Sequence, residues 1–85
     1  MSALDAAVQR LLRERWDPIG VRHIAEAADE YDSYVNGIVG LLTTDQDDEH
    51  LARYLHGIET VSMGLQGDLP HCREVAAELR RLVGA

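Results

Sequence analysis

Two short stretches divide this chain: Trp16-Asp17-Pro18-Ile19-Gly20-Val21 and, eight residues later, Asp29-Glu30-Tyr31-Asp32-Ser33-Tyr34. Together they hold the only tryptophan, one of the two prolines and every aromatic residue except Tyr54. Because the residue before a proline is disfavoured in the α conformation, Pro18 should end the preceding helix near Arg15 or Trp16. Gly20 supports a turn soon afterwards. We therefore expect a structural junction between two helices, made by Trp16, Asp17, Pro18 and Gly20.

Helical periodicity appears on both sides of this junction. Apolar residues recur at helical spacing from Leu4 to Leu12, and Ser2 can cap the helix that they predict. Residues 22–28 are ambiguous and allow only a short helical turn. A second helix should begin between Asp29 and Asp32, where acidic side chains suit a helix N-terminus, and should run through Leu42. Its small residues, Gly37 among them, could let a neighbouring helix come close.

Two further helices are predicted in the second half of the chain. Asp45 is the expected N-cap of the third, with Asp48 three residues later, and Gly64 is expected to end it. The fourth should open after Asp68, with Pro70 tolerated in its first turn. Four amphipathic helices with short connections predict an all-α protein, a small four-helix bundle forming a single helical domain over residues 1–85.

Charge is unevenly distributed along the chain. Its 85 residues carry a formal net charge of −7, yet residues 1–25 and 50–85 are close to neutral. Residues 26–49 hold eight acidic side chains and no arginine or lysine. This excess disfavours nucleic acid and membrane surfaces as partners and favours a basic protein. Two interpretations stay open: a solvated surface that keeps a small domain soluble, or an acidic docking surface.

No pattern typical of catalysis or of metal binding is present. The histidines do not reproduce a zinc spacing, and the acidic residues around Asp47 lack the spacing of a calcium loop. Cys72 lies on an apolar stripe, which favours a buried, inert thiol. We therefore expect no enzymatic activity, no metal and no cofactor. Without an apolar run of membrane-spanning length or a signal segment, a cytoplasmic location is expected.

Two roles are open for the aromatic residues of the junction. Trp16 should pack at the margin of the core while its indole N–H finds an acceptor, and Asp17 should accept backbone hydrogen bonds in the turn. In the first interpretation Trp16, Pro18 and Tyr34 lock the crossing of helices one and two. In the second, Tyr31 is exposed among Asp29, Glu30 and Asp32 and forms an aromatic and acidic patch for a protein partner.

At these residues the chain resembles a widespread, uncharacterised family of small helical bacterial proteins. The shared motifs are W-D-P-I-G-V at residues 16–21, D-E-Y-D-x-Y-V at residues 29–35 and I-E-T-x-x-M-G-L at residues 58–65. The likeness covers about residues 11–79. Members often have proline where this chain has Asn36, a difference that concerns helix initiation. The resemblance implies a small helical protein, without an activity to carry over.

These observations favour a protein that acts by binding another protein. In its most concrete form it is an immunity-type inhibitor of a basic toxin, by analogy of size and charge alone. The expected partner-binding residues are the acidic and aromatic side chains of the central segment, namely Asp29, Glu30, Tyr31, Asp32, Tyr34, Asp45 and Asp48. The alternative is a self-associating structural or regulatory helical protein, such as a homodimer, without catalytic activity.

Overall fold

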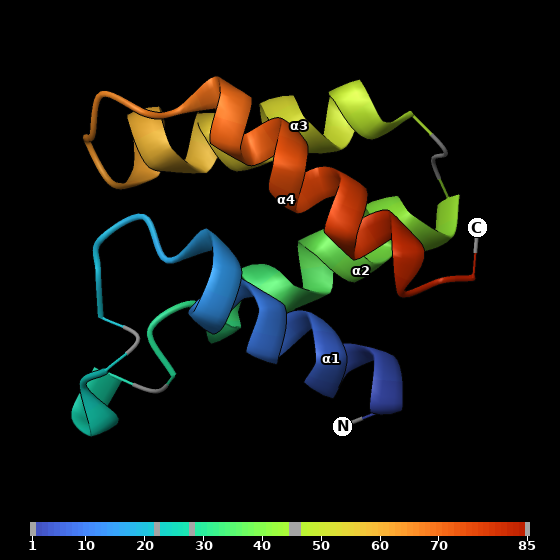
Figure 1. Cartoon of the computed structure of the whole chain (residues 1–85), viewed down its shortest axis with the longest axis horizontal. Coiled ribbons are helices and arrows are strands. Elements are labelled where there is room, and N and C mark those ends of the chain that lie inside the picture. The colour runs from blue at the N-terminus through green and yellow to red at the C-terminus, as the bar shows by residue number, and fades with distance from the viewer. Residues whose placement is uncertain (1, 22, 28, 45–46, 85) are drawn as a thin grey trace.

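The chain is an all-α protein, a small four-helix bundle, as predicted (Figure 1). The computed structural model describes residues 2–21, 23–27, 29–44 and 47–84, and the regular structure of these residues is helical throughout. The four α-helices are α1 (Ala3–Leu11), α2 (Val35–Thr44), α3 (Asp48–Gly57) and α4 (Leu69–Arg81). Two short 3-10 turns, Ala25–Ala27 and Asp32–Tyr34, lie in the connection between α1 and α2.

Two of the α-helices continue into a wider turn. α1 is followed by a π-helical turn at Leu12–Trp16, and α3 by another at Ile58–Ser62. In each turn, a backbone amide donates to the carbonyl oxygen five residues earlier. The Asp17 amide lies 2.9 Å from the Leu12 carbonyl oxygen, and the Met63 amide lies 2.9 Å from that of Ile58. Such turns rotate the residues they contain relative to an α-helix. They therefore set the direction of the side chains that follow α1 and α3.

Side chains cap the helices at most of the expected places. Ser2 accepts a hydrogen bond from the Asp5 amide, and Asp68 accepts one from the His71 amide at the start of α4. The prediction for α3 was wrong: its N-cap is Asp47, which accepts the Glu49 and His50 amides, because only a residue directly before the first turn can reach them. Asp45 lies outside the described residues.

The second α-helix also begins later than predicted, at Val35 and not between Asp29 and Asp32. Tyr31 has φ −102° and ψ 5°, outside the helical range, and only the 3-10 turn Asp32–Tyr34 connects it to α2. The non-helical backbone lets the Tyr31 side chain turn back toward the junction. The local acidic pattern therefore marked a turn and not the first turn of an α-helix.

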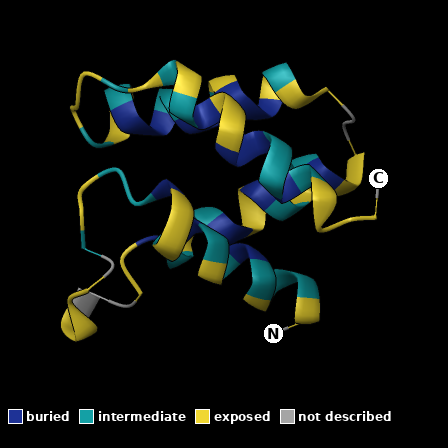
Figure 2. Cartoon of the chain, viewed as in Figure 1, coloured by how far each residue is buried: buried dark blue, intermediate teal, exposed yellow. Residues whose placement is uncertain are grey.

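The helices pack as two pairs, α3 with α4 and α1 with α2 (Figure 1). Their buried faces point toward each other, and the connection between α1 and α2 is mostly exposed (Figure 2). Gly37 of α2 packs under Tyr54 of α3, where a Cβ atom would collide with the tyrosine side chain. The largest fully buried side chains of the core are Trp16, Leu12, Ile38, Leu51, Leu55, Leu79, Val8, Val75 and Cys72. Among the described residues, every helix is too short or too polar to cross a bilayer.

Candidate functional site

The two π-helical turns meet at a buried hydrogen bond between Trp16 and Glu59. The indole Nε1 of Trp16 donates to Oε2 of Glu59 at 2.9 Å, and both side chains are 2% exposed. The other carboxylate oxygen, Oε1, accepts the backbone amide of Asp68 at 2.9 Å. Trp16 thus has the acceptor that its position predicted. Glu59 ties the end of α1 to the start of α4.

Asp17 organises the turn that follows Trp16. Its backbone lies in the left-handed region at φ 35°, a conformation that aspartate tolerates better than most residues. Its Oδ1 accepts the Val21 amide at 2.7 Å, so the expected turn bond is present. The same oxygen accepts the hydroxyl of Tyr31 at 2.8 Å, which joins the two ends of the connection.

Tyr31 is not the exposed aromatic residue that its acidic neighbours suggested. It is 3% exposed, because its ring packs against Trp16 with centroids 5.4 Å apart and its hydroxyl is hydrogen-bonded inside the junction. Tyr34 meets the other edge of Trp16, with centroids 6.1 Å apart and a nearly perpendicular ring. Burial, with the nearby Asp17 carboxylate, raises the pKa of Tyr31. Both tyrosines therefore contact the junction, Tyr31 as a buried ring and Tyr34 as a partly buried one.

The segment from Pro18 to Tyr31 is here called the acidic loop (residues 18–31). It carries several exposed acidic and aliphatic side chains. Glu26, Asp29 and Glu30 are exposed, and no ion pair joins them to a cationic side chain in the described part of the chain. Two aliphatic residues of the same loop are also exposed, Ile19 at 41% and Ile24 at 47%. Just beyond the loop, Asp32 is partly buried and accepts the Gln9 amide group at 2.7 Å.

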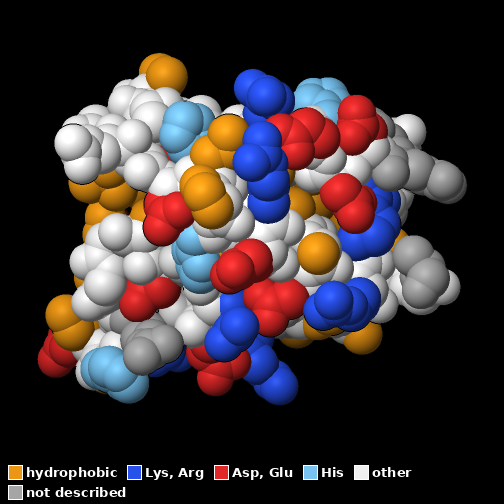
Figure 3. All heavy atoms as spheres, turned by 45° about the horizontal axis from the view of Figure 1, so that its top comes forward, with side chains coloured by type: hydrophobic (Ala, Val, Ile, Leu, Met, Phe, Trp, Pro, Cys, Tyr) orange, Lys and Arg blue, Asp and Glu red, His pale blue; other side chains and the backbone are white. Residues whose placement is uncertain are grey.

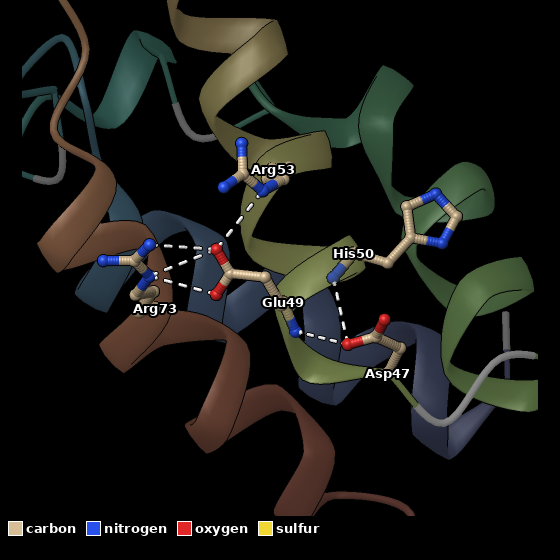
Figure 4. Close-up of polar contacts among 5 residues, drawn as sticks. All are labelled: Asp47, Glu49, His50, Arg53 and Arg73. Atoms are coloured by element: carbon tan, nitrogen blue, oxygen red, sulfur yellow. Dashed lines mark hydrogen bonds and ion pairs between the residues drawn. The ribbon is translucent and has the colours of Figure 1, made fainter.

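The acidic residues at the start of α3 are arranged differently, because arginines of α4 face them. Glu49 receives hydrogen bonds from Arg73 at 3.0 Å and also pairs with Arg53 (Figure 4). The bonds from Arg73 lower the pKa of Glu49. Asp48 accepts the Nε of Arg80 at 2.8 Å. On the face shown in Figure 3, acidic and basic side chains accordingly alternate.

Those predicted partner-binding residues that the structure describes do not lie on one surface, and Asp45 lies outside the described residues. Asp29 and Glu30 precede α2, whereas Asp48 follows it at the opposite end of the molecule (Figure 1). Ten helical residues between them span about 15 Å. The acidic segment therefore divides into the exposed carboxylates of Glu26, Asp29 and Glu30, which form no ion pair among the described residues, and a paired helix N-terminus.

Beside the junction lies an open cleft of about 440 Å³, between the turn at Pro18 and the loop before α4. Trp16, Pro18 and Leu65 give it an apolar wall, while Glu59, Asp68 and His71 supply polar atoms. The Nε2 of His71 lies 2.8 Å from the carbonyl oxygen of Arg15, so this nitrogen carries the proton and donates. Sequence reasoning missed this cleft, since its residues are up to 55 positions apart.

Cys72 is fully buried behind the cleft, and this burial, with its hydrogen bond to Glu59, raises the pKa of Cys72 to about 12. The thiol is therefore protonated near neutral pH and is a poor nucleophile. Among the described residues, no group of three or more His, Cys, Asp or Glu side chains could hold a metal ion.

Glu59 is the residue of this site that the sequence could have indicated. It stands four residues after Leu55 and eight after Leu51, on the apolar stripe of α3. A carboxylate at a core position needs hydrogen-bond donors, which is a reason to search for them.

No protein-family model, curated protein or solved structure matches this chain.

Proposed function

We propose that this chain is a small protein-binding module without catalytic activity, which captures a basic partner protein with its acidic loop. One observation carries the proposal: the exposed carboxylates of Glu26, Asp29 and Glu30 lack cationic partners in the described residues, whereas Asp48 and Glu49 are paired. Exposed Ile19 and Ile24 on the same loop add apolar area that a partner could bury. Tyr31 is buried at the base of the loop, so it supports the loop and is not a contact residue in this proposal.

An immunity-type inhibitor of a basic toxin, located in the cytoplasm, is the most concrete form of this function. An acidic surface speeds the encounter with a basic protein and makes the association rate fall as salt is added. Relation to the W-D-P-I-G-V family of small bacterial proteins is part of the same proposal and rests on the motifs alone. A toxin-like gene beside this one, whose product is neutralised on co-expression, would support this form of the function.

Self-association is the second candidate. An apolar groove of about 490 Å³ lies between Ala3, Ala6 and Ala7 of α1 and the exposed Leu82. Its rim carries both arginine and glutamate, so a second copy related by a twofold axis could match it. Sedimentation equilibrium tests this candidate, and a strict monomer at all concentrations would exclude it.

A matched pair of variants tests the acidic loop. D29N/E30Q and D48N/E49Q each remove two negative charges, the first from the loop and the second from the N-terminus of α3. Immobilised wild type and both variants are exposed to a lysate of the native host, and the captured protein is then purified for binding measurements. We expect the loop variant to lose at least about tenfold in affinity while the α3 variant stays near wild type. Equal binding by all three proteins would exclude the loop as the docking surface.

A further inference from the structure

The cleft beside the junction has a buried carboxylate, and no arginine or lysine is among its described lining residues. Glu59 is 2% exposed, and the two groups that donate to its oxygens, the Trp16 indole and the Asp68 amide, are both neutral. None of the described arginines or histidines forms an ion pair with it. A carboxylate removed from water without a counter-charge is unfavourable, so this position favours a cation supplied from outside.

Two of the carboxylates that line the cleft, Glu59 and Asp68, have acceptor capacity left. A carboxylate offers about four lone-pair positions, and the Trp16 indole and the Asp68 amide, which donate to Glu59, use fewer than that. Asp68 accepts the His71 amide with Oδ1 as the N-cap of α4, and its second oxygen is available to a ligand. Asp17 also borders the opening. The cleft thus gathers three carboxylates around a space of about 440 Å³.

The remaining walls suit an apolar stem. Pro18 and the exposed Leu65 line the cleft together with the buried Trp16. An aliphatic chain can pass between the first two residues, and a planar cation at its end can meet the tryptophan and the carboxylates together. Among protein side chains, arginine has this shape, and its flat, weakly hydrated guanidinium has donors for more than one carboxylate.

We propose that this cleft binds the side chain of one arginine presented by the basic partner protein. This inference rests on the proposed function and deepens it, because Asp17 and Pro18 belong both to the rim of the cleft and to the base of the acidic loop. A partner lying on the loop can therefore insert an arginine beside it. The acidic loop provides the long-range attraction, and the cleft provides a specific contact near the centre of the interface.

A pair of matched ligands tests the cleft without the partner. N-acetyl-arginine amide and N-acetyl-citrulline amide have nearly the same shape, but citrulline has a neutral urea group in place of the guanidinium. Trp16 is the only tryptophan of the chain, so its fluorescence reports binding in the cleft directly. We expect saturable binding of the arginine amide with a Kd of about 1 mM, and at least about tenfold weaker binding of the citrulline amide. Equal binding of the two, equally tight binding of N-acetyl-lysine amide, or no saturation by the arginine amide would overturn the proposal.

Two variants identify the carboxylates involved. E59Q keeps an oxygen for the Trp16 indole, and D68N keeps a good N-cap residue, so D68N remains informative if E59Q folds poorly. We expect each folded variant to bind the arginine amide about fivefold to tenfold more weakly, as for a charge-assisted hydrogen bond replaced by a neutral one. Wild-type affinity in D68N would overturn the assignment of Asp68.

The variant D29N/E30Q separates this inference from the proposed function. It should bind the arginine amide like wild type, because the cleft is intact, while its affinity for the captured partner falls. Failure of the arginine amide to bind, with partner capture still dependent on the loop, overturns the cleft alone. Arginine binding with capture independent of the loop overturns the proposed docking surface instead.

Discussion

The two ends of this molecule hold their carboxylates in opposite ways. At the junction, Glu59 accepts neutral donors and is almost fully buried, and Asp17 accepts the Tyr31 hydroxyl. At the other end, Asp48 and Glu49 are paired with arginines, and their side chains are 51% and 42% exposed. Glu59 and Asp17 join segments that would otherwise separate: α1 with α4, and the two ends of the acidic loop. The arginine pairs join helices that their apolar faces already hold together.

This difference predicts where stability depends on acidic residues. A buried acceptor that is removed leaves its donors without partners and without water, which costs about 1–3 kcal/mol for each donor. An exposed ion pair loses little, because water replaces the missing partner. The single carboxylates of the junction should therefore matter more than the ion-pair network of α3 and α4.

The largest expected effect comes from Glu59→Ala. It leaves the Trp16 indole and the Asp68 amide without their acceptor and opens a void beside the core. We expect the free energy of unfolding to fall by about 3 kcal/mol, measured by urea denaturation. Glu74→Ala is the control, since that side chain is 75% exposed. A loss below about 1 kcal/mol would contradict the importance given to the junction.

Sequence patterns were sufficient for the helices but not for this network. Apolar periodicity and caps such as Ser2 and Asp68 act within a few residues, so four helices could be predicted from local sequence. The partner of Trp16 lies 43 positions away, and the apolar spacing that places Glu59 toward the core does not say which donors it meets there. The hydrogen-bond network of the site could therefore be identified only from the packed structure.

Tyr31 is a second case in which local sequence did not predict the environment of a side chain. Acidic neighbours on both sides suggested an exposed ring, but the tyrosine leaves the helical path and packs on Trp16. Likewise the arginines that pair with Asp48 and Glu49 lie 32 and 24 positions away. A run of acidic residues therefore does not reveal which of its members are paired in the fold.

The second prediction concerns Asp17. One of its carboxylate oxygens, Oδ1, accepts both the Val21 amide and the Tyr31 hydroxyl. Asp17→Ala removes both bonds and places alanine at φ 35°, so we expect a loss of about 2 kcal/mol in thermal unfolding. Asp17→Asn keeps an oxygen acceptor and tolerates the left-handed backbone, and should lose less than about 1 kcal/mol. If both variants lost the same stability, the hydrogen bonds would not be what holds the base of the loop.

The third prediction concerns alkaline pH, where the junction should weaken first. The folded-state pKa values of Cys72 and Tyr31 are both raised above their ordinary values of 9.0 and 10.0. Their stabilising contributions are therefore complete below those ordinary values and are lost as pH rises above them, because the unfolded chain releases the protons first. One such group changes stability by up to about 1.4 kcal/mol per pH unit.

Denaturation curves between pH 8 and about 10.5 measure this slope, which should begin near the unfolded thiol pKa of Cys72. Cys72→Ala should be less stable at neutral pH and should show a flatter decline above pH 9. Tyr31→Phe should leave the first part of the decline unchanged and flatten its later part. Parallel curves for wild type and both variants would contradict a role of these two protons.

The smallest effect is expected at the paired end, from Glu49→Gln. Arg73 lowers the pKa of Glu49, so its contribution is present above the ordinary carboxylate pKa and is lost as pH falls through the lowered value. The side chain is 42% exposed, so added salt screens the pair. A double-mutant cycle with Arg73→Gln should therefore give a weak coupling at low salt that disappears at high salt. A coupling that persists in high salt would mean that this pair holds α3 to α4, and the contrast between the two ends would then fail.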